Sequence, residues 1–194
     1  AEIALAGYEG AMTGPNPKRS AEQIIADLAK HSLKPAPGYL GEDFWDPARE
    51  REILEKAHVF GEFHRAVGLT ELYVAAGGFD NYVTRRGMTR RQVSGHVTPD
   101  DFMTDEEFTQ FANVLNKVGE ITLEYGVKSC FHNHVGSSIE TGAEIDALFS
   151  LLDTPWRNYA STRHHRLHAR TALLLLYLTS LSIALHCTLR CIRG

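Results

Sequence analysis

The residues of this chain best suited to chemistry lie in residues 131–141, FHNHVGSSIET. His132 and His134 stand at alternate positions, and Glu140 follows the second histidine by six residues. On a strand that ends near Gly136, both histidine side chains point to the same face, because side chains alternate along a strand. Neutral imidazole and carboxylate are ordinary ligands of divalent metals such as Zn and Mn. Two interpretations stay open: a metal and sugar site, or strand-end histidines bonded to backbone carbonyls.

The elements that must position these residues follow from apolar runs and helix caps. Strands are predicted over residues 2–11, 33–41, 69–78 and 127–136. Helices are predicted over residues 20–31, 47–68, 104–126 and 141–153, three of them with a Ser or Thr cap and one with Pro at its start. This alternation predicts parallel strands with helices packed outside them.

Two α/β architectures are compatible with the alternation, a (β/α) barrel and an open doubly wound sheet. No glycine-rich nucleotide-binding motif follows any predicted strand, which argues against a nucleotide-binding fold. In a barrel, catalytic groups gather at the carboxyl ends of the strands. The segments HNHVG (residues 132–136) and AAGG (residues 75–78) fall at such ends.

Composition narrows the class of protein and of partner. The chain has 194 residues, 43% of them hydrophobic and 23% charged, which is ordinary for a globular domain. The net charge of −4 and the lack of a nucleic-acid motif argue against a nucleic-acid partner. Residues 85–91, RRGMTRR, are interpreted as a solvated basic loop. An odd number of cysteines and no signal-like start predict a cytoplasmic protein.

Charge changes abruptly near Pro155. Residues 1–153 hold 14 basic and all 24 acidic residues, for a net charge of −10, whereas residues 154–194 hold six arginines and no acid. We predict that this Arg/His/Leu-rich tail is helical and serves packing or association. Its uncharged run, residues 171–185, is shorter than the ~20 residues that span a bilayer, so no membrane is expected. The tail is either an out-of-frame or artificial fusion or a divergent C-terminal domain.

Three segments together resemble a known family. They are FHNHVGSSIETGAEIDALFSLLD, AGYEG and LKPAPGYLGEDFWDPAREREILEKA. Over residues 1–153 the chain resembles the inosose dehydratase branch of the xylose-isomerase-like TIM barrels, the sugar phosphate isomerase/epimerase superfamily. The resemblance implies a partial (β/α) TIM barrel of about four β/α units. It also implies a divalent metal (Mn, Co, Mg or Zn) and proton transfer next to the carbonyl of a small sugar or polyol.

The resemblance also suggests roles for individual residues. His134 matches the place where sugar epimerases of the superfamily carry their first metal-binding glutamate, and Glu140 matches a second acidic site residue. His134 and Glu140 are therefore expected metal ligands, and Glu140 and His132 are expected catalytic residues. The candidates for binding the substrate are Tyr39, Trp45 and Asn133, although core packing explains the aromatic residues equally well.

One departure from the family pattern bears on activity. The family continues with D-T-G-H, whose aspartate binds metal, and here STRHH places Ser161 at that position. Two functions are therefore carried forward. The first is a metal-dependent sugar or polyol isomerase, epimerase or dehydratase with weakened activity. The second is a non-catalytic, truncated half-barrel that folds and self-associates as a homo-oligomer, because four strands cannot close a barrel.

Overall fold

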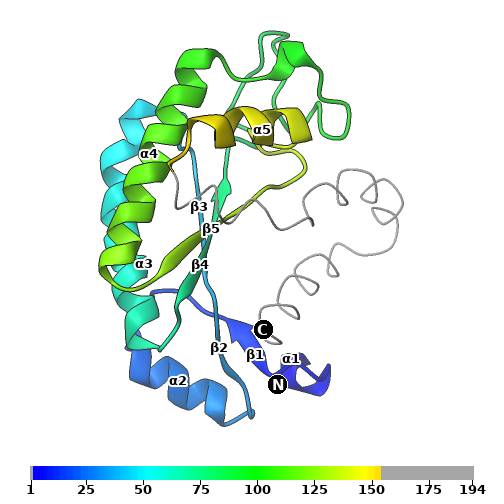
Figure 1. The fold of residues 1–194 in the computed structure, drawn as a ribbon. Coiled ribbons are helices and arrows are strands. Elements are labelled where there is room, and N and C mark those ends of the chain that lie inside the picture. Colours follow the sequence, from blue (N-terminus) through cyan, green and yellow to red (C-terminus); the bar gives the residue numbers. More distant parts are fainter. Residues whose placement is uncertain (1, 154–194) are drawn as a thin grey trace.

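The computed structural model describes residues 2–153, and Figure 1 shows their fold. Its strands are β1 (Gly10–Met12), β2 (Lys34–Ala36), β3 (Tyr39–Glu42), β4 (Glu71–Ala76) and β5 (Lys128–His132). Its α-helices are α1 (Glu2–Leu5), α2 (Ala21–Ala29), α3 (Glu50–Ala66), α4 (Asp105–Glu124) and α5 (Gly142–Leu151). Two short 3-10 helices are η1 (Pro47–Arg49) and η2 (Pro99–Asp101).

All strand pairs in the described residues are parallel. β1 pairs with β2, and β3, β4 and β5 form a second sheet in that order. Two neighbouring parallel strands need a long connection between them, because the chain must return to the end at which the first strand began. In this second sheet a helix makes each of these connections. The parallel pairing and the intervening helices confirm the predicted α/β class.

The single strand predicted over residues 33–41 is divided into β2 and β3. The first half pairs with β1 and the second half pairs with β4, so the two sheets meet at Pro37 and Gly38. At this break the Gly38 carbonyl accepts the N–H of Tyr73 (3.0 Å), and its own N–H donates to His64 Nε2 (2.9 Å). A Cβ at Gly38 would lie 2.3 Å from the Thr13 carbonyl oxygen, so only glycine allows this close approach.

The imidazole of His64, on α3, lies at the junction between the two sheets. It is fully buried, and both of its ring nitrogens are bonded. Nδ1 lies 2.8 Å from the Phe60 carbonyl, and Nε2 accepts the Gly38 N–H. His64 therefore ties α3 to the junction between the two sheets.

The strand predicted over residues 2–11 is largely wrong. Only Gly10–Met12 is a strand, while Glu2–Leu5 forms the short helix α1, none of whose residues is buried. Ala, Leu and Glu favour a helix where no neighbouring strand is packed against the segment. The apolar run therefore reflects an exposed turn of helix, with Leu5 86% exposed, and not a buried strand.

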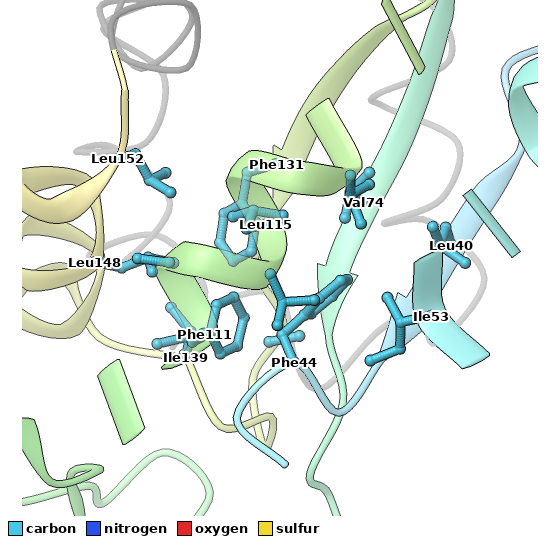
Figure 2. Packing of buried hydrophobic residues seen from close by; sticks show 14 of the residues in the cluster. Leu40, Phe44, Ile53, Val74, Phe111, Leu115, Phe131, Ile139, Leu148 and Leu152 are labelled. Carbon is cyan, nitrogen blue, oxygen red and sulfur yellow. The ribbon is translucent and has the colours of Figure 1, made fainter. Parts of the chain in front are cut away.

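The core lies between the outer face of the second sheet and helices α3, α4 and α5. Leu40, Val74 and Phe131 come from three neighbouring strands and occupy adjacent register positions. They belong to the same buried cluster as Phe111 and Leu115 of α4, as Figure 2 shows. Strand side chains alternate, so residues beside these in β3 and β5, such as Tyr39 and His132, face the opposite side of the sheet.

The predicted helix caps are confirmed where they fall in described residues. Ser20, Thr104 and Thr141 each accept a backbone N–H three residues on and form complete capping boxes. No helix within residues 2–153 has the length and apolar character needed to cross a bilayer. The helix predicted in the tail and its use in packing lie outside the described residues.

Candidate active site

The two histidines of the H-x-H segment meet at the carboxyl end of β5. Their ring centroids are 4.5 Å apart and nearly perpendicular, so the two side chains meet as predicted, although β5 ends at His132 and not near Gly136. Tyr39 of β3 lies against both rings, 5.7 Å from that of His134 and 6.5 Å from that of His132. Tyr73 of β4 contacts His132, and Phe79 contacts His134.

Burial sets the protonation states of this cluster. The His134 side chain is half-buried, and desolvation lowers its pKa below the ordinary value of 6.5. Burial raises the pKa of Tyr39 to about 12. At neutral pH the cluster therefore offers a neutral imidazole, which can accept a proton or bind a metal, and a phenol that keeps its proton.

Glu140 is held by the backbone of two loops. Its Oε1 accepts the N–H of Gly95 (2.8 Å), and its Oε2 accepts the N–H of Gly136 (2.7 Å). The Asn133 side-chain amide donates to the Glu140 carbonyl (3.4 Å). Among residues 2–153, no group of three or more His, Cys, Asp and Glu side chains is placed to hold a metal ion. The structure thus joins His132, His134 and Tyr39, and it anchors Glu140 elsewhere in the same loop.

Arg90 fixes the loop that carries Glu140. It is fully buried and pairs with Glu144, with 2.8 Å between Nη1 and Oε1. Its Nε donates to the Ser137 carbonyl (2.8 Å). Glu144 Oε2 in turn accepts the N–H groups of Glu140 (3.1 Å) and Thr141 (2.8 Å). Both ends of the segment between Ser137 and Thr141 are therefore tied to one buried ion pair.

The interpretation of residues 85–91 as a solvated basic loop holds for most of its residues but is wrong for Arg90, which is fully buried. Besides the burial of Arg90, Arg86 makes two 2.7 Å bonds to the carboxylate of Asp101. Burial alone would raise the pKa of Asp101, but hydrogen bonds from Arg86 and Thr98 lower this pKa to about 2. Asp101 and Glu144, the acids that pair with Arg86 and Arg90, lie beyond the loop in the sequence, so the local charge count could not reveal these two pairs.

The predicted substrate-binding residues divide between the site and the core. Tyr39 and Asn133 lie beside the histidines or Glu140. Trp45 instead packs edge-on against Tyr82, with 5.0 Å between ring centroids, and belongs to the rim of the hydrophobic core. Phe44 is fully buried within that core.

A pocket of about 360 Å³ adjoins the histidine cluster. It lies at the carboxyl ends of β3 and β4, where the chain supplies polar groups that sequence reasoning did not select. Asp43 follows β3 directly, and Phe79 and Asn81 follow the glycines after β4. Their position just after strand ends is the signal that could have identified them.

Comparison with known proteins finds sequence relatives for most of the described residues. No protein-family model matches the chain. The inosose dehydratase of Klebsiella pneumoniae subsp. pneumoniae is 27% identical over 156 residues, covering 78% of this chain and 48% of the relative. The chain thus spans about half the length of the curated relatives that it matches.

Solved structures show the same fold at low sequence identity. D-allulose 3-epimerase from Methylomonas sp., in complex with D-allulose, matches with a TM-score of 0.53 and 16% identity over 79% of this chain and 51% of that chain. The IolI protein with a bound zinc atom matches with a TM-score of 0.50 and 16% identity, over 76% of this chain and 50% of that chain.

The relatives and the fold agree with the resemblance read from the sequence. Parallel strands with outer helices, and half-length matches to sugar isomerases and epimerases, confirm a partial TIM barrel. Sequence relatives and structural neighbours thus support the resemblance of this chain to the xylose-isomerase-like superfamily of TIM barrels.

Proposed function

We propose that the chain acts as a divalent-metal-dependent isomerase, epimerase or dehydratase of a small sugar or polyol. The proposed reaction moves a proton at the carbon next to a carbonyl. The observation that carries the proposal is the contact of His132, His134 and Tyr39 at the carboxyl ends of the strands. Support comes from inosose dehydratases as sequence relatives and from an epimerase that binds D-allulose as a structural neighbour.

A divalent metal fits part of this donor set. Burial favours the neutral form of His134, which is the form that binds metal. Two adjacent imidazoles suit Zn, Mn or Co, and the IolI neighbour binds zinc. In the proposal His134 is a ligand, and Glu140 becomes a second ligand once its carboxylate is released from the backbone. When bound, the metal would supply Lewis-acid stabilisation of negative charge on the substrate oxygen.

The remaining roles belong to side chains of this chain. His132 exchanges the proton with the substrate carbon, because a neutral imidazole nitrogen can accept a proton and the protonated ring can return it. Tyr39 donates a hydrogen bond to a substrate oxygen, since its pKa of about 12 keeps the phenol protonated. Asn133 binds a substrate hydroxyl beside it. Glu140 reaches a catalytic or metal-binding position only after its carboxylate leaves the N–H of Gly95 or Gly136.

The test compares His134→Ala with His58→Ala in the full chain. His58 is exposed and bonded to Tyr125, so it is a matched control away from the strand ends. After loading with Mn, Co or Zn, we expect elemental analysis to give much lower metal content for His134→Ala than for His58→Ala. Equal metal content in the two variants would contradict the assignment of His134.

Turnover of a keto-inositol by the purified chain is expected to be weak or undetectable. Ser161 replaces the metal-binding aspartate implied by the family motif, and a lost ligand is seldom compensated by the others. The second candidate function, a non-catalytic half-barrel, is favoured by the lack of a three-ligand group within the described part of the chain. Robust turnover without a second enzyme would exclude this second candidate.

A further inference from the structure

The pocket beside the histidines shares its walls with them. Tyr39 and Phe79 line the pocket, and the rings of both also contact His134. A molecule in the pocket therefore lies next to the imidazole. No role for the polar residues of this pocket follows from the H-x-H segment, because they come from the loops after β3 and β4.

Asp43 is the best-positioned polar group in the pocket. Its Oδ2 accepts a hydrogen bond from the Asn81 side-chain amide (2.6 Å). Its Oδ1 lies against Gly77, where an added Cβ would be only 2.4 Å away. The absence of a side chain at Gly77 thus creates the place that this oxygen occupies. Two contacts from the segment after β4 set the direction of the carboxylate.

Asp43 and Asn81 can still form hydrogen bonds with a ligand. Within residues 2–153, neither Asp43 Oδ1 nor the Asn81 carbonyl makes another side-chain bond. The carboxylate is a strong acceptor, and an amide offers both a donor and an acceptor. A hydroxyl group both donates and accepts, so two hydroxyls on neighbouring carbons complement the pair. The rings of Tyr39 and Phe79 supply apolar walls for the carbon skeleton.

The charges around the pocket favour an uncharged ligand. Arg91 also lines the pocket, but two bonds of 2.7 and 2.9 Å join its guanidinium to Asp80. With Arg91 neutralised in this way, Asp43 leaves the pocket with a net negative charge. Like charges repel, so a phosphate or carboxylate group would be disfavoured here.

We propose that Asp43 and Asn81 bind two neighbouring hydroxyl groups of a polyol whose ring or chain lies against Phe79 and Tyr39. This inference rests on the proposed function, because it places the ligand beside His134. It assigns substrate positioning to the loops after β3 and β4, and it leaves proton transfer to the end of β5.

The experiment measures binding of myo-inositol to the full chain by isothermal titration calorimetry. Cyclohexanol, which has the same ring and a single hydroxyl, is the comparison ligand. We expect Asn81→Ala and Gly77→Ala to weaken myo-inositol binding by about tenfold or more, because each disturbs the charged acceptor. Gly142→Ala is the matched glycine control, since its Cβ meets nothing within 4 Å.

Three outcomes would overturn the inference: no myo-inositol binding by the wild-type chain, equal binding of cyclohexanol, or unchanged affinity in Asn81→Ala. Asn81 is exposed, so its replacement should leave the fold intact even if Gly77→Ala does not. Circular dichroism of each variant checks this point. Myo-inositol binding that depends on Asn81 supports the inference even where no keto-inositol is turned over. The failure of the proposed function is therefore distinguishable from the failure of this inference.

Discussion

The histidines of this chain differ in what surrounds their rings. His64 has both nitrogens engaged, one by the Phe60 carbonyl and one by the Gly38 N–H. The His134 ring lies against the rings of Tyr39 and Phe79, and His58 bonds a tyrosine hydroxyl at the surface. A buried imidazole that accepts a backbone N–H must stay neutral, whereas a half-buried one at a strand end remains available for chemistry.

His64 predicts a loss of stability at mildly acidic pH. Burial lowers the pKa of His64 below 6.5, the ordinary value that applies to the unfolded chain. As the pH falls below 6.5, the unfolded chain takes up a proton that the folded chain refuses, so the free energy of unfolding falls until the lowered pKa is reached. Above this window the contribution is fully present. Urea unfolding at roughly pH 7.5 and pH 5.5 measures the difference.

Two variants separate this effect from other titrating groups. His64→Gln should destabilise the protein at both pH values and reduce its pH dependence, because the titrating ring is gone. His134 shifts in the same direction, so some dependence should remain. His58→Gln is the control at an exposed position. A pH dependence of the same size in His64→Gln and in wild type would show that His64 does not cause it.

Residue types in the strand-end site could be predicted because the pattern is local. His132 and His134 are two positions apart in the sequence, and their rings meet even though β5 ends at His132. Asp43 and Asn81 are 38 residues apart and meet only because β3 and β4 pair in register. The role of Trp45 could not be decided from its type, since an indole suits a sugar pocket and a core rim equally well.

At the scale of elements, helix starts depend on local sequence, whereas the break between β2 and β3 depends on contacts between distant segments. The capping boxes at Ser20, Thr104 and Thr141 were predictable because donor and acceptor lie within one turn. The division between β2 and β3 was not, because it depends on the approach of the Thr13 carbonyl and of His64 to Gly38. Contacts between distant segments decide such features, and no periodicity records them.

The ion pair between Arg90 and Glu144 predicts how firmly the site loop is held. Both side chains are fully buried, and the pair joins the loop around Arg90 to the start of α5. Arg90→Met should lower the free energy of unfolding by about 3–5 kcal/mol, because it leaves a buried carboxylate without its cation. Chemical denaturation measures the change. The double variant Arg90→Met/Glu144→Gln should lose less stability, because it removes the unpaired charge as well.

Arg51→Met is the control for this prediction. Arg51 is 92% exposed and 4.0 Å from Glu55, and exposed pairs of this kind contribute little. Its replacement should change stability by less than about 0.5 kcal/mol. A loss of similar size in Arg51→Met and Arg90→Met would mean that the buried pair does not hold the loop.

At the scale of the whole molecule, the described strands are a part of a barrel. The strands follow one another in the order of a TIM barrel, with β2 and β3 together taking the place of one barrel strand between β1 and β4. A complete barrel closes with about eight strands. The resemblance to the superfamily could be recognised from short motifs such as FHNHVGSSIET, because each is contiguous in the sequence. The cytoplasmic location, the helical tail and the homo-oligomer were inferred from composition and geometry, and they stay predictions.

Assembly is the prediction that the partial barrel makes most directly. A sheet of parallel strands with an open inner face is unstable in water unless another segment or chain covers it. Two copies would supply about eight strands, and a two-fold pair is the commonest closed assembly. We therefore expect the full chain to form a homodimer or a higher oligomer, with an interface that includes apolar residues of 171–185.

Leu176→Asp should weaken association, because it places a charge in that apolar run, whereas Val59→Asp on the exposed side of α3 should not. Light scattering over micromolar concentrations measures the mass of each variant. A monomer at every concentration in the wild-type chain would mean that the chain covers the inner face by itself.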